Sequence, residues 1–131
     1  MDIRKEFTIG APRDAVWAAL TDPEVIVSWG GGPTVMAPVP GFAFSLWDGD
    51  IHGTVTAADP QHTMSQEWYS GDWASPSLVT FTLSDDPDGL THVRLVQTGV
   101  PDDEVAEIDA GWDEYYFDPL TRLLEEGAAW A

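Results

Sequence analysis

VPDDEVAEIDAGWDEYYFDPLTRLLEE, the stretch at residues 100–126, decides the fold that this sequence predicts. Its apolar residues recur at intervals of three and four, which is the spacing that lines one face of a helix. They are Val105, Ile108, Trp112, Tyr115/Tyr116, Leu120 and Leu123. We expect a long helix with Asp102, Asp103 and Glu104 in its first turn, where carboxylates complement the positive end of the helix dipole. An apolar helix face needs a surface to cover, so the rest of the chain is expected to supply a sheet.

Two residues inside this stretch modify the expected helix. Gly111 stands beside Trp112 and, having no side chain, leaves room for a close backbone approach. Pro119 lacks the N–H that would bond to the Tyr115 carbonyl, so the turn before it is expected to kink or loosen.

The first 30 residues predict one strand and two short helices. Residues 2–9 alternate in polarity, with Lys5 as the one polar member of the otherwise apolar side. A first helix is expected to start at Ala11-Pro12. Asp22 is the expected N-cap of a second helix, with Pro23 as its first residue. The glycines that follow this helix end it, and we expect a mobile loop at Gly30–Thr34.

The middle of the chain alternates with a period of two, which predicts strands. A hairpin is expected around Asp48-Gly49, and three further strands follow. The side chains expected on the inner face of this sheet are Phe42, Phe44, Leu46, Met64, Gln66, Trp68, Val79, Phe81, Leu83, Val93, Leu95 and Gln97. The sequence therefore predicts a single α+β domain over residues 1–131, with an antiparallel sheet wrapped around the last helix.

The composition and net charge of the chain exclude some classes of partner. The chain has 131 residues, is 44% hydrophobic and carries a net charge of −18. Such a charge repels phosphate backbones and anionic lipid surfaces, so neither nucleic acid nor a membrane is an expected partner. The negative charge either keeps the protein soluble or forms an acidic binding face. We favour the first interpretation, because runs of charged residues are usually solvated. The sequence shows no signal-peptide core and no apolar run of roughly 18 residues, which favours a cytoplasmic protein.

Several segments resemble a known family. They are APRDAVWAALTDPEVIVSW (11–29), GFAFSLWDGDIHG (41–53), PSLVTFTL (76–83), the turn Gly89-Leu90-Thr91 and GWDEYYFDPL (111–120). Together they are similar to the AHSA1-like proteins, homologues of the Hsp90 ATPase activator, in the START/SRPBCC superfamily to which the Bet v 1-like proteins also belong. The resemblance implies a helix-grip fold, β-α-α-β6-α, with a cavity between the sheet and the long C-terminal helix.

Eight residues are candidates for lining such a cavity: Trp29, Phe44, Gln66, Trp68, Phe81, Gln97, Trp112 and Tyr116. The aromatic members serve as core or as pocket wall, and core packing is the more general use. Gln66 and Gln97 need partners if buried, so they are expected either to bond their neighbours or to act as polar contacts for a ligand. We expect the loops Gly30–Thr34 and Gly71–Ser75 to act as mobile gates to the cavity.

The residues do not predict catalysis, a metal or a cofactor. Cysteine is absent, and the three histidines lack metal-site spacing. Acid–base chemistry is the one enzymatic option, through Glu67, His52 and Tyr116 if they face inward. Strand alternation turns Glu67 outward.

Three hypotheses remain for function. The first is a non-catalytic domain, monomeric or homodimeric, that holds a small, mostly apolar molecule between the sheet and the C-terminal helix. The second is a co-chaperone or stress-related interaction module that contacts an Hsp90-type chaperone, as the resemblance implies. The third is a cyclase- or hydrolase-type enzyme of the superfamily.

Overall fold

The chain forms one antiparallel sheet with its helices on one side, as seen in a computed structural model that describes residues 2–71 and 73–130, with side chains to residue 126. In chain order the elements are β1 (Ile3–Ile9), α1 (Arg13–Thr21), α2 (Pro23–Trp29), β2 (Ala43–Leu46), the turn η1 (Trp47–Gly49), β3 (Ile51–Asp59), β4 (Thr63–Ser70), β5 (Ser77–Asp86), the turn η2 (Pro87–Gly89), β6 (Leu90–Thr98), α3 (Val105–Gly111), the π-helical segment η3 (Trp112–Phe117) and α4 (Asp118–Trp130).

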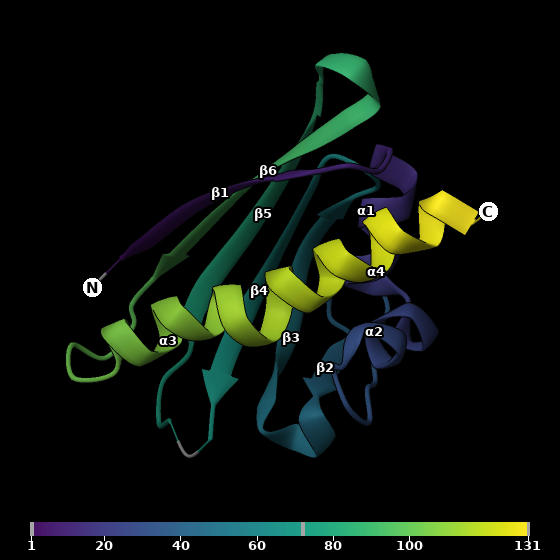
Figure 1. Cartoon of the computed structure of the whole chain (residues 1–131). Helices are drawn as coiled ribbons and strands as arrows, with labels where there is room; N and C mark the ends of the chain where they lie inside the picture. The colour runs from purple at the N-terminus through teal and green to yellow at the C-terminus, as the bar shows by residue number, and fades with distance from the viewer. Residues whose placement is uncertain (1, 72, 131) are drawn as a thin grey trace.

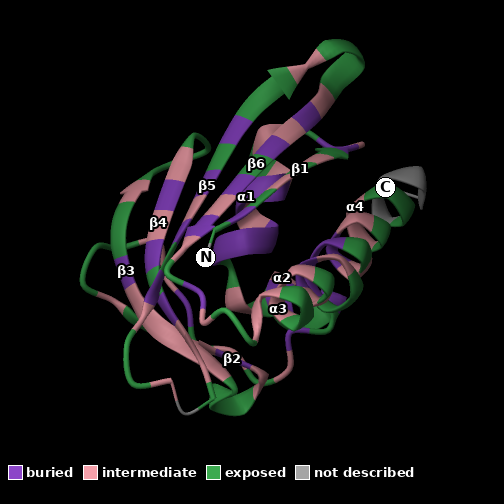
Figure 2. Ribbon diagram, turned by 90° about the vertical axis from the view of Figure 1, so that its left-hand side faces the viewer, coloured by how far each residue is buried: buried purple, intermediate pink, exposed green. Residues whose placement is uncertain are grey.

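The sheet has the order β1-β6-β5-β4-β3-β2, and every pair of neighbours is antiparallel. It curves around the α3–η3–α4 rod, which crosses its concave face (Figure 1). Figure 2 shows the helices together on this one side, with buried residues between the two layers. The predicted α+β helix-grip fold is confirmed.

The strand count differs by one from the fold that the resemblance implies. Five strands, not six, follow the helix pair in the described part of the chain. Between α2 and β2 the chain makes only a single bridge, Val35 to Ser45. The glycines and prolines of this segment explain why it goes no further, because they weaken or interrupt strand hydrogen bonding.

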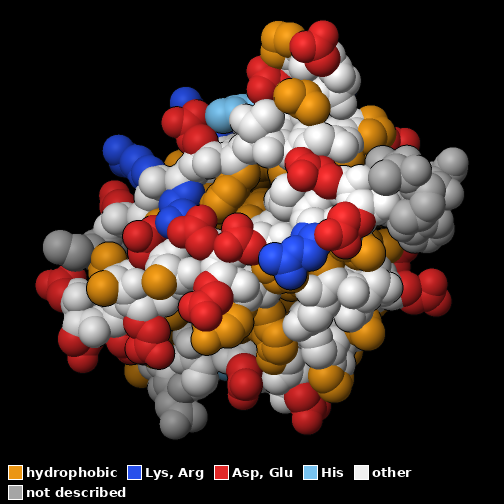
Figure 3. Space-filling view, viewed as in Figure 1, with side chains coloured by type: hydrophobic (Ala, Val, Ile, Leu, Met, Phe, Trp, Pro, Cys, Tyr) orange, Lys and Arg blue, Asp and Glu red, His pale blue; other side chains and the backbone are white. Residues whose placement is uncertain are grey.

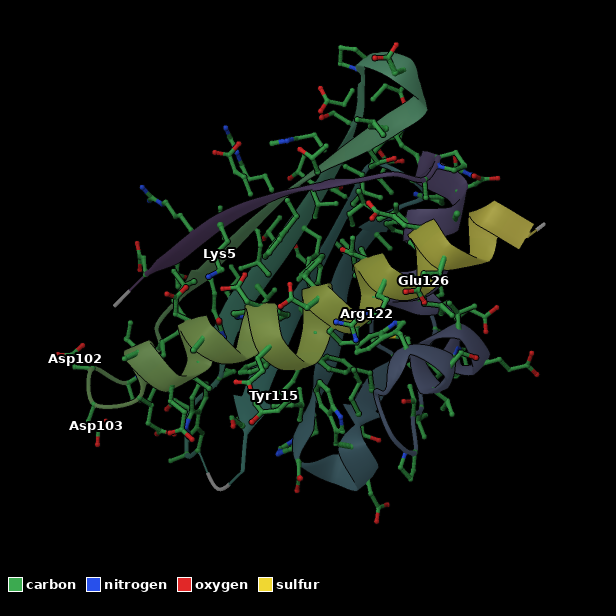
Figure 4. The ribbon with its side chains drawn as sticks, viewed as in Figure 1. Lys5, Asp102, Asp103, Tyr115, Arg122 and Glu126 are labelled. Carbon is green, nitrogen blue, oxygen red and sulfur yellow. The ribbon has the colours of Figure 1, made fainter. Side chains whose placement is uncertain are left out.

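The inner face of the sheet matches the predicted alternation. Every side chain predicted there from β4, β5 and β6 is buried, whereas Glu67 on the opposite face is exposed. Lys5 is the informative exception on β1. Its ammonium group reaches the helix and donates to Asp109 Oδ1 at 2.8 Å and to Asp113 Oδ2 at 2.7 Å (Figure 4). The polar residue in the apolar row is therefore an ion-pair link between β1 and the helix.

The long helix begins later than predicted. Asp102 and Asp103 lie in a turn before it, and α3 starts at Val105 with Glu104 as its N-cap residue. The three acidic residues are thus outside the first turn. The predicted loosening before Pro119 is confirmed: the helix continues through η3, where the Asp118 N–H bonds to the carbonyl of Asp113, five residues back. The wider π turn accommodates the missing proline donor.

The π turn also changes which residues face the sheet. Trp112, Tyr116 and Phe117 are all buried, while Tyr115 is 61% exposed. The predicted stripe assigned Tyr115 to the covering face and omitted Phe117, and both assignments are wrong. A stripe counted at 3.6 residues per turn cannot anticipate a segment with a longer period.

The second helix is capped as predicted. The Asp22 side chain accepts from the Glu24 N–H at 2.9 Å, Pro23 is the first helical residue, and Gly30 ends α2 in the left-handed region at φ 111°. The Trp29 indole donates to the Ala19 carbonyl at 2.8 Å, which ties α2 to α1. None of the helices described is both long and apolar enough to traverse a lipid bilayer.

Candidate functional site

An open pocket of about 340 Å³ lies where the helix crosses the ends of β3 and β4. The sheet side and the turn before β3 contribute Trp47, Asp50, Ile51, Trp68 and Ser70, and the helix contributes Glu107, Ile108, Gly111, Trp112, Tyr115 and Tyr116. Figure 3 shows hydrophobic side chains exposed beneath the helix on this side of the molecule, with acidic side chains around them. Pockets of this size and apolar character are typical of small-molecule sites.

The sheet side of the pocket depends on a strained turn. Trp47 has φ 50° and Asp48 has φ 55°, in the left-handed region that non-glycine residues rarely adopt. Trp47 is held there by the glycine loop, because its backbone N–H donates to the Gly31 carbonyl at 2.7 Å and its indole to the Gly30 carbonyl at 2.8 Å. The ring thereby comes within 6.2 Å of the Tyr116 ring, centre to centre.

The loop Gly30–Thr34 therefore packs behind Trp47 as a support for the pocket wall. An added Cβ at Gly32 would lie 3.0 Å from the Trp47 Cα, so the fit there is close. The second predicted gate, Gly71–Ser75, follows pocket residue Ser70, and Asp72 within it lies outside the described residues. The mobility of both loops stays a prediction.

The helix side of the pocket is shaped by Gly111. The sequence predicted a close backbone approach at this glycine, and that interpretation is wrong: an added Cβ would meet only the Tyr115 ring, at 3.9 Å. The absent side chain instead leaves space in the pocket. Tyr115 lies on the outside of the helix next to this space (Figure 4) and forms part of the rim.

Tyr116 is the most buried tyrosine that lines the pocket. The residue is only 4% exposed, and its ring packs 4.8 Å from Trp112 and 4.7 Å from Trp29, centre to centre. Its hydroxyl makes no hydrogen bond within the described residues. No fully enclosed side-chain polar atom in this part of the chain lacks a partner, so the oxygen keeps some contact with solvent. Burial raises the pKa of this hydroxyl, which therefore stays protonated.

A buried hydrogen-bond chain fixes the Trp112 wall. The Trp112 indole donates to Gln97 Oε1 at 2.8 Å, Gln97 Nε2 donates to Ser77 Oγ at 2.8 Å, and Ser77 Oγ donates to the Trp68 carbonyl at 3.1 Å. Gln97 is thus bonded through both ends of its amide. The chain connects the helix to β6, β5 and β4 and sets the position of the Trp112 ring against Trp68, at 5.4 Å.

All eight predicted site residues are buried on the helix side of the sheet, but they separate into two groups. Trp68, Trp112 and Tyr116 line the pocket. Trp29, Phe44, Gln66, Phe81 and Gln97 lie in the core around it. Among them, Gln66 makes its one side-chain hydrogen bond within the described residues to Met64 Sδ, at 3.9 Å.

Sequence reasoning missed most of the other pocket residues, chiefly Trp47, Asp50, Glu107, Gly111 and Tyr115 as site members. The only available signal was the aromatic residue directly before the Asp48-Gly49 turn. Nothing local in the sequence pairs that turn with a helix more than 50 residues later.

The groups considered for acid–base catalysis do not come together. Tyr116 lies in the pocket, whereas Glu67 is exposed on the opposite face of the sheet. His52 alternates with Ile51 and Gly53 and stacks on Tyr69 at 5.1 Å, ring centre to ring centre. No cluster of metal-binding side chains occurs among the residues that the structure describes.

Comparison with known proteins then decides the family. Residues 10–125 match the family model described as "Activator of Hsp90 ATPase homolog 1-like protein". The chain belongs to this family. Its AHSA1-like relatives include the activator of 90 kDa heat shock protein ATPase homolog 1 of Homo sapiens, 25% identical over 125 residues, and its homologue from Dictyostelium discoideum, 38% identical over 86 residues. These matches cover 95% and 64% of this chain, but only 37% and 22% of the relatives' lengths.

Solved structures of other proteins share the fold. An HSP90 activator from Plasmodium falciparum superposes with a TM-score of 0.87 at 20% identity, covering 97% of this chain and 96% of that one. A protein from Mesorhizobium loti gives 0.78 at 29% identity, covering 96% and 98%. DynU16, from the dynemicin biosynthetic locus, gives 0.82 at 27% identity and covers 96% of this chain but 48% of that one.

Proposed function

We propose that this AHSA1-like domain, residues 1–131, is a non-catalytic binding module that holds a small, largely apolar molecule in the pocket between the helix and the ends of β3 and β4. The observation that carries the proposal is Tyr116, which is 4% exposed, lines an aromatic pocket and has a hydroxyl without a partner within the described residues. A ligand can supply the hydrogen bond that this hydroxyl lacks and cover the apolar walls.

The pocket walls suit such a ligand because they are rigid. The Trp112 ring is fixed by its bond to Gln97, and Trp47 is fixed by two bonds to the glycine loop. A site whose aromatic walls are already in place loses little side-chain freedom on binding. This preorganisation favours binding of a molecule over a purely structural use of the aromatic cluster.

The test fills the pocket from a position that leaves the core unchanged. Gly111→Leu places a side chain in the pocket, and the Cβ itself meets no closer neighbour than the Tyr115 ring. We expect the uncharged probe N-phenyl-1-naphthylamine to bind the wild-type protein saturably with enhanced emission, and to bind Gly111→Leu at least about tenfold more weakly. Gly111→Ala, which adds only the Cβ, is the matched control for helix effects. Equal binding by Gly111→Leu and the wild type, or no saturable binding at all, would contradict the proposal.

We propose a second function from the family alone: contact with an Hsp90-type chaperone. The supporting observation is the match to relatives named as activators of the 90 kDa heat shock protein ATPase. Because the chain spans 22% and 37% of two such relatives, their full activity does not transfer directly. The experiment is a titration of a purified Hsp90-type chaperone with this protein, monitored by calorimetry and by the chaperone's ATP turnover. Absence of heat and of any change in turnover would remove this candidate.

A further inference from the structure

The charges at the pocket rim are all of one sign. Asp50 and Glu107 line the pocket from opposite sides, one from the turn before β3 and the other from α3. Both are exposed, and neither side chain makes a hydrogen bond or an ion pair within the described residues. None of the chain's five Lys and Arg residues lines this pocket. A ligand therefore meets two uncompensated carboxylates at the entrance.

The lysine and arginine side chains lie elsewhere on the molecule. Lys5 bonds Asp109 and Asp113 on the helix, and Arg13 bonds Asp85 at 2.8 Å. Arg4 and Arg94 lie beside Lys5 at a separate hollow on β1 and β6, and Arg122 lies along α4. The potential at the aromatic pocket is consequently negative, both locally and from the net charge of −18.

The walls of the same pocket attract positive charge. Five aromatic rings line it: Trp47, Trp68, Trp112, Tyr115 and Tyr116. The face of an indole or phenol ring attracts an ammonium group within about 6 Å, and this attraction strengthens as the cation loses water. Tyr116 also lines the pocket, and its hydroxyl, which has no partner within the described residues, offers a further acceptor. Aromatic faces, a buried acceptor and rim carboxylates together favour a cation with an apolar body.

We propose that the pocket binds an organic ammonium ion, a protonated or quaternary amine carried on an apolar group. This inference rests on the proposed ligand-binding function and names its ligand class. The apolar body fills the space beside Gly111 and Ile108, and the ammonium group lies between the aromatic rings and the carboxylates of Asp50 and Glu107. An anionic ligand of the same shape is repelled by both carboxylates.

The experiment compares three probes of similar shape and different charge. Phenyltrimethylammonium is the cation, tert-butylbenzene is its neutral counterpart and benzenesulfonate is the anion. Each is titrated into the full chain while tryptophan emission is recorded, because three of the seven tryptophans line the pocket. We expect the cation to bind at least about tenfold more tightly than the neutral probe, because cation–π attraction and the two rim carboxylates both favour the cation. The anion is expected not to bind.

Variants locate the effect. The double variant Asp50→Asn with Glu107→Gln is expected to lower the affinity for the cation until it approaches the affinity for tert-butylbenzene, both measured on the same variant. Asp59→Asn with Asp88→Asn changes the net charge equally, at the far end of β3 and in the turn after β5, and is expected to leave the preference intact. Loss of the preference in this control would assign it to the overall charge and overturn the proposal.

The outcomes separate this inference from the proposed function. If tert-butylbenzene binds as tightly as the cation and Gly111→Leu blocks both, the pocket binds ligands but the ammonium assignment is wrong. If none of the three probes saturates and N-phenyl-1-naphthylamine also fails to bind, both proposals fall. Tighter binding of the cation that is weakened by the Asp50/Glu107 variant and abolished by Gly111→Leu supports both.

Discussion

At the scale of single residues, the molecule depends on side chains whose polar atoms are fully used inside an apolar core. Gln97 is 0% exposed and bonds both Trp112 and Ser77. Buried amides that make all their hydrogen bonds fix the geometry around them, whereas removing one partner leaves the other group desolvated and unpaired. The sequence left two roles open for Gln97, bonding its neighbours or contacting a ligand. The structure shows the first, because both ends of its amide are bonded within the protein.

We therefore expect Gln97→Leu to lower the free energy of unfolding by about 1–3 kcal/mol, since it leaves the Trp112 indole N–H without its acceptor and removes the donor to Ser77 Oγ. Urea unfolding followed by circular dichroism measures the change. Trp112→Phe removes the indole donor, and the double variant Gln97→Leu/Trp112→Phe is expected to lose less than the sum of the two single variants. Additive losses would show that the two side chains are not coupled.

Two glycines are expected to respond oppositely to the same substitution. An added Cβ at Gly53 would lie 1.8 Å from the Glu67 carbonyl oxygen on the neighbouring strand, so Gly53→Ala must push β3 and β4 apart. Gly111→Ala meets nothing closer than 3.9 Å and replaces a poor helix former. We expect Gly53→Ala to destabilise by about 1–3 kcal/mol or more, and Gly111→Ala to stabilise by up to about 1 kcal/mol. Melting temperatures test both, and a similar shift for the two variants would contradict the space assigned at each site.

At the scale of elements, the sheet was predictable and the helix only partly so. Alternation is a local property, so the inward rows of β4, β5 and β6 follow from the sequence. The π turn does not follow from the local sequence alone. It accommodates the missing donor of Pro119 and also places Phe117 against Phe7, and the two rings stack at 4.0 Å, centre to centre. Phe7 lies on β1, more than 100 residues away, and no periodicity in residues 105–120 reports it.

The link between β1 and the helix has a pH dependence of known sign. Burial lowers the pKa of Lys5, but the hydrogen bonds and charges of Asp109 and Asp113 outweigh it and raise the pKa above 10.5. The stabilisation from this link is therefore complete below pH 10.5 and is lost as the pH rises through the folded-state pKa.

We expect the difference in unfolding free energy between the wild type and Lys5→Met to stay constant to about pH 10 and to shrink at higher pH, because Lys5 then loses its charge. Tyrosine ionisation in the same range affects both proteins alike and cancels in the difference. Urea titrations across this range provide the measurement. Arg4→Met is the matched control, since Arg4 makes only a 3.8 Å ion pair with Asp2 on an exposed surface. A difference that does not change with pH would show that the ion pair contributes nothing to stability.

At the scale of the whole molecule, the sequence predicted the fold class but not the place of the site. The core residues and the pocket residues have the same chemistry, so Phe81 and Trp68 could not be distinguished by type. What separates them is the crossing point of the helix, which depends on the lengths of β3 and β4 and on the turn at Trp47. The rim residues Asp50 and Glu107 look like ordinary surface charges until the turn and the helix come together.

The net charge of −18 is also a property of the whole chain. Like charges repel more strongly in the compact state than in the unfolded chain, and salt screens them over about 10 Å at 0.1 M. We expect the melting temperature to rise when NaCl is increased from about 0.01 M to about 0.5 M at neutral pH. The same increase near pH 4, where carboxylates begin to protonate, is the control and is expected to have a smaller effect. A melting temperature that falls with salt at neutral pH would show that attractive pairs such as Lys5 with Asp109 dominate.

The register of β1 with β6 has a consequence for how the protein is made. Ile3 pairs with Gln97 and Ile9 with Thr91, so β1, the first strand of this domain, has its only sheet partner among the described strands in β6, the last of them. The meander from β2 to β5 consists of neighbouring hairpins and is able to assemble during translation. β1 cannot pair until β6 has been synthesised, and its apolar face stays uncovered until the helix has also been synthesised. Completion of this fold is therefore a late event in the synthesis of this domain, and the nascent domain is most exposed to holding chaperones in the interval before it.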